Sequence, residues 1–420
     1  MPARGIVEGT ARVRHRVERV AFISLHTSPL AQPGAGDSGG MNVYVRELAA
    51  ALAQTGVECI TYVRADRPGL AREVRVEPNH TVVHIEAGPY HLPKEALVDV
   101  LDEATAAILA DIDSRGGIDV VHAHYWLSGE IGHRIKHTLG VPFVVTFHTL
   151  ARVKAAAGDR EPDYRAHGEA TQIGCADAVC VSCPAEADDL LAHHGHPPGE
   201  IVTVTPGVQH AFFAPGDRHG ARHAVGLDAD VPVVLFAGRI QPLKGPDVAI
   251  RAVAQMEHTE AHLVMIGGAS GADGSAEVAR MRGLVNDLDL DGRVHFVDPV
   301  PHHVLGTWYR AADVVVVPSR SESFGLVALE AAACGTPVVA SAVGGLTSLV
   351  DDGRNGFLVP ERSPAAFAAA LDTVLANPAL ATSMSMEAAL GARAYTWLAT
   401  GQALHEVYAD LSRRAPVNCA

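Results

Sequence analysis

The sequence predicts an α/β protein made of two doubly wound, Rossmann-like domains with a ligand cleft between them. Short apolar runs alternate with amphipathic stretches, as strands and helices do in a parallel sheet. The alternation starts again after the polar segment 215–230, and a length of 420 residues is enough for two domains. The space between two such domains is the expected ligand site.

The first half of the chain contains apolar runs of strand length separated by helical patterns. Runs that are apolar throughout are typical of strands buried on both faces. The predicted strands are Arg19–Leu25, Glu58–Val63, Thr81–Ile85, Asp119–His122, Phe143–Thr146, Ala178–Val181 and Ile201–Val204. The predicted helices are Val43–Ala53, Lys94–Ile112, Tyr164–Gly174 and Ala185–His193.

The second half repeats this organisation without a strict sequence repeat. The predicted strands are Val231–Ala237, His262–Ile266, Arg293–Val297, Val314–Val317 and Pro337–Ala340. Helices are predicted near 246–256, 275–287, 303–311, 324–334 and 364–376, and the Ala-rich tail 379–415 is predicted to be helical.

These elements predict an N-terminal domain at 19–214 and a C-terminal domain at 215–396, with a hinge at Pro215–Asp230. A helix at about 397–415 is expected to pack back on the N-terminal domain. Residues 1–18 contain several Arg and no apolar segment, so they are predicted to be a disordered basic tail rather than a signal peptide or membrane anchor.

The charge balance excludes several classes of partner. The chain has 33 Lys and Arg against 48 Asp and Glu, a formal net charge of −15. This balance argues against nucleic acid or an anionic membrane as the main partner, and any anion site must be a local pocket of Arg and Lys. No apolar run reaches the ~18 residues of a membrane span, so we expect a cytoplasmic protein.

The cysteines and histidines give no metal or redox signature at this level. Cys180-Val-Ser-Cys183 has the spacing of half a zinc or redox site, but it lies in a predicted strand and no second pair follows. We interpret both residues as small apolar core residues. The 23 histidines scatter through loops and strand ends, and we find no metal-ligand spacing among them.

Two carboxylates follow a buried strand in the stretch Pro318–Glu330. A polar loop carries Glu322, and a helical pattern from Phe324 places Glu330 about two turns further along, roughly 10 Å away. The free N–H groups of a helix N-terminus favour anions. A ligand that touches both carboxylates and the helix end is elongated and anionic, as a sugar joined to a nucleotide diphosphate is.

Two cations follow the first strand of the second domain, in Gly238–Gly245. Arg239 and Lys244 lie between a buried strand and a helix, where they can bracket a diphosphate. Loop cations are usually just solvated, but this strand end faces the Glu322–Glu330 segment in the predicted sheet. Both cations would neutralise charge that develops on a departing nucleotide diphosphate.

Polar segments also follow the strands of the first domain. The loop Gln32–Asn42 has four glycines within seven residues, which permit close backbone approach to a ligand; a merely mobile loop is the alternative. His122–Trp126 and Phe147–Thr149 end neighbouring strands and suggest a polar pocket. Lys94 and Arg165 could add positive charge there, although each alone is typical of an exposed cation.

Several common catalytic motifs are missing from the sequence. Neither half has Gly-x-Gly-x-x-Gly after its first strand, which argues against a dinucleotide dehydrogenase, and there is no Gly-x-Ser-x-Gly or P-loop. Asp-x-Asp triplets at 111–113, 228–230 and 287–289 could hold Mg²⁺ under a diphosphate. They fall at helix ends or before a strand, so we interpret them as solvated surface and predict no required cofactor or metal.

Together, the motifs Glu322-x7-Glu330, Gly238-Arg-x4-Lys244-Gly and Gly39-Gly40 resemble the retaining family 4 glycosyltransferases of the GT-B fold. The resemblance covers nearly all of 19–410. Within that family, one branch belongs to the mycothiol pathway and moves N-acetylglucosamine from UDP to inositol phosphate. The stretches similar to that branch are His26–Leu30, Gly36–Tyr44, His124–Gly129 and Glu322–Val327.

The resemblance implies a nucleotide-sugar donor, a small polar acceptor and a role for each motif. Arg239 and Lys244 would hold the diphosphate, Glu330 the ribose and Glu322 the sugar hydroxyls, while His148 would approach the sugar. The implied catalytic residues are His148, Arg239, Lys244 and Glu322. The implied donor-binding residues are Gly39, Gly40, Gly238, Arg239, Lys244, Glu322, Ser323, Phe324, Gly325, Leu326, Val327 and Glu330. The implied acceptor-binding residues are His26, Asp37, Ser38, Gly40, Met41, Asn42, Lys94, Tyr125, Thr149 and Arg165.

Three positions depart from that branch. Ala155–Glu161 replaces an acidic, Asn-containing insert, Val300 replaces an Arg near the base, and Ala166 replaces a second Arg beside the phosphate-binding one. A relative recruited to specialised metabolism, with another nucleotide sugar (for example GDP-linked) and another small acceptor, is therefore an alternative. A sugar-nucleotide epimerase and a non-catalytic nucleotide-sugar sensor are two more, and the sequence is compatible with a homodimer.

Overall fold

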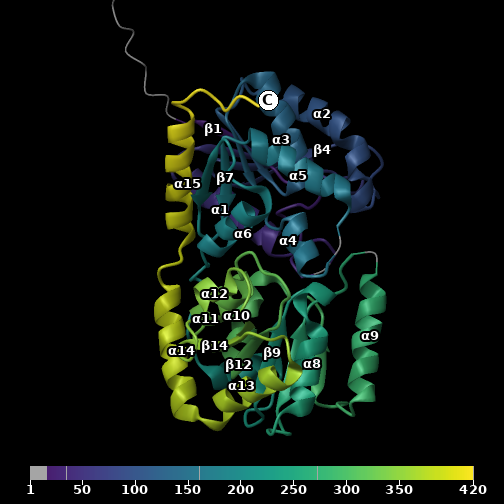
Figure 1. The fold of residues 1–420 in the computed structure, drawn as a ribbon, viewed down its shortest axis with the longest axis vertical. Helices are drawn as coiled ribbons and strands as arrows, with labels where there is room; N and C mark the ends of the chain where they lie inside the picture. Colours follow the sequence, from purple (N-terminus) through teal and green to yellow (C-terminus); the bar gives the residue numbers. More distant parts are fainter. Residues whose placement is uncertain (1–16, 35, 160, 272, 420) are drawn as a thin grey trace, which may run out of the picture.

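The computed structural model describes residues 17–34, 36–159, 161–271 and 273–419. They form two α/β lobes stacked along the long axis of the molecule (Figure 1). Most of the predicted basic tail, residues 1–16, lies outside the described residues. Val17 lies within them and is buried in the core.

The N-terminal lobe contains an eight-stranded sheet of order β3-β4-β2-β1-β5-β6-β7-β8. All neighbouring strands pair in parallel except β3 and β4, which pair antiparallel. The strands are β1 Arg19–Ile23, β2 Glu58–Arg64, β3 Glu73–Glu77, β4 His80–Ile85, β5 Val120–His124, β6 Phe143–Thr146, β7 Ala178–Val181 and β8 Glu200–Thr203.

The C-terminal lobe contains a six-stranded parallel sheet of order β11-β10-β9-β12-β13-β14. The strands are β9 Val233–Ala237, β10 His262–Ile266, β11 Val294–Val297, β12 Val314–Val317, β13 Val338–Ser341 and β14 Gly356–Val359. Both sheets are doubly wound, because strand order reverses beside the first strand of each lobe. This is the fold class that the sequence predicted.

Helices cover both sheets. In the N-terminal lobe they are α1 Gly40–Gln54, η1 Lys94–Val100, α2 Leu101–Ser114, α3 Trp126–Leu139, α4 Ala151–Ala156, α5 Asp163–Cys175 and α6 Pro184–His194. In the C-terminal lobe and tail they are α7 Arg218–Val225, η2 Pro242–Lys244, α8 Pro246–Gln255, α9 Gly274–Asp287, α10 His302–Ala311, α11 Leu326–Ala333, α12 Leu346–Leu349, α13 Pro364–Ala376, α14 Pro378–Ala392 and α15 Trp397–Leu411.

Each predicted strand is present with ends within two residues, but β3, β14 and several helices, α3 among them, were not predicted. The glycines of α3 lower its helix propensity, yet packing requires them. A Cβ on Gly132 would lie 2.6 Å from the Phe143 ring, and one on Gly129 would overlap Gln172. Close packing of α3 on the sheet and on α5 therefore overrides local preference.

The predicted hinge at Pro215–Asp230 is wrong. This segment forms α7, whose N-terminus is capped by the Asp217 side chain and which packs against α10. Arg222 is buried and its guanidinium lies 2.6 Å from the carboxylate of Asp313. These contacts fix the segment to the C-terminal lobe.

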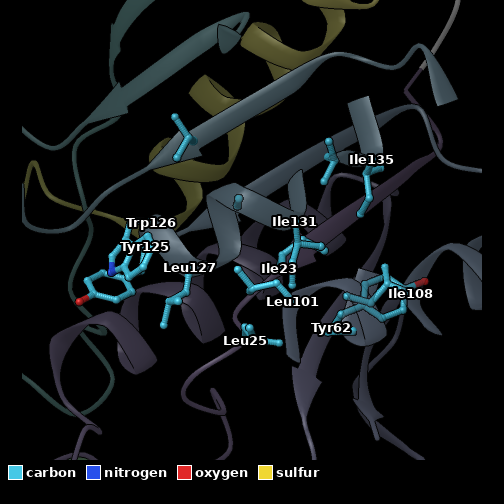
Figure 2. Close-up of a cluster of buried hydrophobic side chains, with 14 of the residues drawn as sticks. Ile23, Leu25, Tyr62, Leu101, Ile108, Tyr125, Trp126, Leu127, Ile131 and Ile135 are labelled. Atoms are coloured by element: carbon cyan, nitrogen blue, oxygen red, sulfur yellow. The ribbon is translucent and has the colours of Figure 1, made fainter. Parts of the chain in front are cut away.

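The largest buried cluster of the N-terminal lobe lies between the sheet and helices α2 and α3. Ile23, Tyr62, Ile108 and Ile131 are packed within it (Figure 2). Tyr125 lies at one edge of this cluster, beside Trp126 (Figure 2). The core therefore fixes the position of the polar residues that follow β5.

The chain crosses between the lobes twice, once after β8 and once between α14 and α15. Helix α15 runs back along the N-terminal lobe and packs against α1 (Figure 1). The two crossings touch, because Val208 pairs with Thr396 and the Thr400 hydroxyl donates to the Thr205 carbonyl at 2.7 Å. The connection between the lobes is thus a pair of chain segments that are hydrogen-bonded to each other.

In the described part of the chain, no helix by itself has the length and apolar character needed to cross a membrane. Helices α13 and α14 together pass that test by length and composition only, and they are bent by 99° at the break between them.

The close approach of the two crossings requires glycine at position 207. A Cβ there would overlap the backbone of Thr396 and Trp397. We expect Gly207→Ala to lower the Tm by roughly 5 °C, because overpacking typically costs about 1–3 kcal/mol. Differential scanning calorimetry would measure the shift.

Gly283→Ala, on the exposed face of α9 where an added Cβ meets nothing within 4 Å, is the matched control and should not lower the Tm. Equal Tm values for the Gly207 variant and the control would contradict the steric argument.

Candidate active site

A cleft of about 250 Å³ lies between the two lobes and is lined by residues of both. Its walls follow the carboxyl ends of β6 and β7 on one side and of β9, β10, β11 and β12 on the other. All twelve of the predicted donor-binding residues line it: Gly39, Gly40, Gly238, Arg239, Lys244, Glu322, Ser323, Phe324, Gly325, Leu326, Val327 and Glu330.

Lys244 and Glu322 meet directly in this cleft, with Lys244 Nζ 2.6 Å from Glu322 Oε2. Lys244 ends η2, and Glu322 lies in the loop after β12. Gly245 has a φ of +71° and a Cβ there would overlap the Pro318 carbonyl, so glycine lets the two loops approach. A half-buried cation and carboxylate are therefore available to a ligand in one place.

Arg239 is the second cation of the cleft. Its Nη1 donates to Ser270 Oγ at 3.2 Å, and a Cβ on Gly39 would lie 3.3 Å from its Nε. Burial lowers the pKa of Arg239, and the nearby carboxylates of Asp37 and Glu322 oppose that shift. Even with its pKa lowered, a guanidinium keeps its charge at neutral pH, so the cleft holds a half-buried cation beside the glycine-rich loop.

Glu330 is buried and both of its carboxylate oxygens are held by protein side chains. Oε1 lies 2.6 Å from His302 Nε2, and Oε2 accepts from the Tyr309 hydroxyl at 3.0 Å. Burial by itself lowers the pKa of His302. The negative charge of Glu330 and its hydrogen bond raise the pKa by more than burial lowers it, so the net shift is upward. His302 lines the cleft but was not predicted as a site residue; its place after β11 was the available signal.

His148 follows β6 and reaches the cleft with a backbone φ of +61°. Such a conformation is strained for a non-glycine residue and is common at functional sites. Its Nε2 lies 3.1 Å from His124 Nδ1, and its carbonyl accepts from the Ser323 hydroxyl of the other lobe. Burial lowers the pKa of His148 to about 3, so the ring is neutral at neutral pH.

Of the predicted acceptor-binding residues, Gly40, Met41 and Thr149 line the cleft. Others form an adjoining cluster around the Tyr125 ring. The His26 ring centroid is 4.5 Å from that of Tyr125, the Arg165 guanidinium carbon 4.8 Å, and Lys94 Nζ 5.9 Å. Lys94 also lies 3.7 Å from Asp37. We refer to these five residues as the Tyr125 cluster.

His26 is the residue of this cluster that is best placed to bind a polar ligand. Its Nδ1 is buried and has no hydrogen-bond partner among the described residues. Burial, followed by the positive charge of Lys94, lowers its pKa to about 3. A neutral imidazole with an unsatisfied ring nitrogen can bond to a hydroxyl group of a ligand.

The charge of Arg165 is already balanced by two glutamates. Its Nε lies 2.8 Å from Glu169 and its Nη1 lies 2.9 Å from Glu161. Its Nη2 donates to the Thr149 carbonyl and hydroxyl at 2.7 and 3.0 Å. Glu161 belongs to the segment that departs from the resembled branch, and it also pairs with Lys154.

Asn42 holds the glycine-rich loop rather than facing the cleft. Its amide donates to Thr27 Oγ1 and the Ser28 carbonyl, both at 2.6 Å, and its Oδ1 accepts from the Gly39 N–H at 2.8 Å. Ser38 lies 3.3 Å from the same Thr27 hydroxyl. These bonds shape the loop in front of α1.

The structure also places the two cysteines that were predicted to be core residues and the apolar Val300. Cys180 and Cys183 are buried and free, as small core residues are, and Cys183 Sγ lies 3.3 Å from the Ser323 carbonyl. Val300, which stands where the resembled branch has an Arg, lines the cleft as an apolar residue.

Comparison with known proteins agrees with this geometry. A Glycosyl transferase 4-like domain model matches residues 39–207, and a Glycosyl transferases group 1 model matches residues 217–394. A Catenulispora acidiphila protein named D-inositol 3-phosphate glycosyltransferase 2 is 44% identical over 402 residues, covering 93% of this chain and 94% of that protein.

An Acidothermus cellulolyticus protein named D-inositol 3-phosphate glycosyltransferase is 46% identical over 405 residues, covering 93% and 90% of the two chains. Among solved structures, sucrose-phosphate synthase from Thermosynechococcus elongatus superposes with a TM-score of 0.88 at 33% identity, covering 94% of this chain and 99% of that one. The chain therefore belongs to the family 4 glycosyltransferases of the GT-B fold, and it is a glycosyltransferase.

Proposed function

We propose that the protein transfers N-acetylglucosamine from UDP to inositol phosphate with retention of configuration at the anomeric carbon. The observation that carries the proposal is the meeting of Arg239, Lys244, Glu322 and the first residues of α11 in one interdomain cleft. Two cations and a helix N-terminus suit a diphosphate, and carboxylates at two depths suit sugar and ribose hydroxyls. The choice of inositol phosphate follows the names of the relatives, and the choice of UDP-N-acetylglucosamine follows the resemblance to the mycothiol branch alone.

In the proposed reaction the acceptor hydroxyl attacks the anomeric carbon from the face that the diphosphate leaves. The bond from the anomeric carbon to the phosphate oxygen breaks, and that oxygen accepts the hydroxyl proton. No covalent bond to the enzyme forms. Arg239 and Lys244 neutralise the charge that develops on the diphosphate, which is electrostatic catalysis.

Neutral His148 is proposed to donate a hydrogen bond to the transferred sugar. The carbonyl of the same residue accepts from Ser323 of the other lobe, so the position of His148 depends on closure of the two lobes. Closure also excludes water, which limits hydrolysis of the donor. We propose that no metal is required, because the cations of the cleft can supply the charge that Mg²⁺ would.

An unphosphorylated polar acceptor is a second candidate, and Arg165 favours it. In the resembled branch the matching Arg is expected to bind the acceptor phosphate. Here Glu161 and Glu169 balance its charge, and Ala166 stands beside it. A phosphate would have to compete with Glu161 for the guanidinium, whereas a neutral polyol would not.

The Lys244→Ala variant tests the proposed donor site. We expect kcat to fall by about 10²–10³, the usual effect of removing one group that stabilises transition-state charge. Arg251→Ala, which removes an exposed cation of α8, is the control and should leave kcat unchanged. Nucleotide release with UDP-N-acetylglucosamine and inositol phosphate is the assay. Near-normal turnover in a folded Lys244→Ala protein would remove the basis of the assignment.

The Glu161→Ala variant distinguishes the two candidate acceptors. Calorimetric titration with UDP, GDP and ADP first selects the nucleotide, and inositol phosphate or inositol is then added to the nucleotide-bound protein. Because the variant frees Arg165, we expect its affinity for inositol phosphate to rise about tenfold, while its affinity for inositol stays the same.

The Asp163→Ala variant removes an exposed carboxylate from the first turn of α5, the helix that carries Arg165. It is the matched control and should bind both acceptors as the unchanged protein does. If inositol phosphate fails to bind both the unchanged protein and Glu161→Ala, it is not the acceptor, and the unphosphorylated candidate takes its place.

A further inference from the structure

Four groups that commonly bind metals meet at the end of the N-terminal lobe far from the cleft. His133 and His137 lie on α3, Cys175 is the last residue of α5, and Cys419 lies in the segment after α15. One ligand atom from each lies within 4.8 Å of the others. The C-terminal segment reaches this place by crossing the top of the lobe from α15 to α3 (Figure 1).

The separations resemble those of a tetrahedral zinc site. His133 Nε2 lies 3.0 Å from His137 Nε2, which lies 3.4 Å from Cys175 Sγ. Zinc–nitrogen and zinc–sulfur bonds of about 2.0–2.3 Å place neighbouring ligand atoms roughly 3.3–3.8 Å apart at tetrahedral angles. Both separations are therefore within a few tenths of an ångström of such an arrangement.

The fourth group, Cys419, can adjust. Its sulfur is joined to that of Cys175 as a disulfide in this structure, so metal binding requires that bond to be reduced and the two sulfur atoms to separate. The segment that carries Cys419 has no helix or strand between residues 412 and 419 and can supply this small movement.

The position of the segment is fixed independently of the four groups. The carboxylate of Asp177 accepts a hydrogen bond from the Val417 N–H and another from the Phe143 N–H. Lys136 is buried, pairs with Asp177 at 2.9 Å and donates to the Cys175 carbonyl at 2.7 Å. This network holds both cysteines next to the two histidines.

The expectation from the sequence that the histidines lack metal-ligand spacing is wrong for this pair. His133 and His137 are four residues apart on one helix, so their rings lie on the same face. The two cysteines are 244 residues apart in sequence, and only the fold brings them together. No local motif therefore revealed the complete set.

We propose that His133, His137, Cys175 and Cys419 form a structural zinc site that fastens the C-terminal segment to the N-terminal lobe. Two thiolates and two neutral imidazoles are a common structural zinc set, and four protein ligands leave no open position for water. The two thiols lose their protons on binding, so the occupied centre is neutral. A disulfide between the cysteines is the competing arrangement, in which the two imidazole nitrogens, 3.0 Å apart, share a hydrogen bond with each other.

The test measures metal bound to the full chain. The protein is purified with a thiol-free reductant and without chelators, and its zinc is measured by elemental mass spectrometry. We expect about one zinc per chain, and we expect His137→Ala and Cys419→Ser to lose most of it. His167→Ala, an exposed histidine of α5, is the matched control and should keep the zinc.

Cobalt titration of the metal-free, reduced protein gives a second readout that does not depend on the variants folding. Two thiolate ligands predict charge-transfer absorption in the near ultraviolet together with the visible bands of tetrahedral Co²⁺. Zinc that is unchanged in both site variants would overturn the proposal. So would a reduced protein that retains no zinc and gives no cobalt spectrum; a disulfide between Cys175 and Cys419 would then explain their contact.

Discussion

The carboxyl ends of parallel strands all lie on the same side of a sheet. In this chain the carboxyl ends of the two sheets face each other across the cleft. Every predicted donor-binding residue follows or faces one of these strand ends, so the cleft is a consequence of the two topologies. The paired crossings at Val208 and Thr396 keep the edges opposed. Contacts such as the Ser323 hydroxyl on the His148 carbonyl then join loops that are 175 residues apart.

The fold and the donor side of the cleft could be predicted because their signals are local. Buried strands such as Val314–Val317 are continuous apolar runs, and the cations and carboxylates follow them within a few residues. Helix α3 could not be predicted, since its two glycines contradict helix propensity and are explained only by Phe143 and Gln172. The hinge prediction was wrong for a similar reason. The polar segment forms helix α7, which is stabilised by a contact with a distant residue, the Arg222–Asp313 pair.

The acceptor side and the metal-ligand group were harder to predict from the sequence, because the role of each residue depends on partners that are distant in the chain. Arg165 is a cation in the sequence, but Glu161 and Glu169 balance its charge in the fold. His302 is held in the cleft by its contact with Glu330. Cys419 and Cys175 are 244 residues apart, and the whole C-terminal lobe lies between them in the sequence. Charge pairing on the acceptor side is therefore the feature that the sequence by itself could not predict.

A crystal structure with UDP bound would test the central claim most directly, namely that the interdomain cleft is a nucleotide-diphosphate site. The account predicts diphosphate oxygens within hydrogen-bond distance of Arg239 and Lys244, at the N-terminus of α11, with the ribose beside Glu330. A nucleotide bound outside the cleft, or in the cleft with its diphosphate away from both cations, would contradict the account.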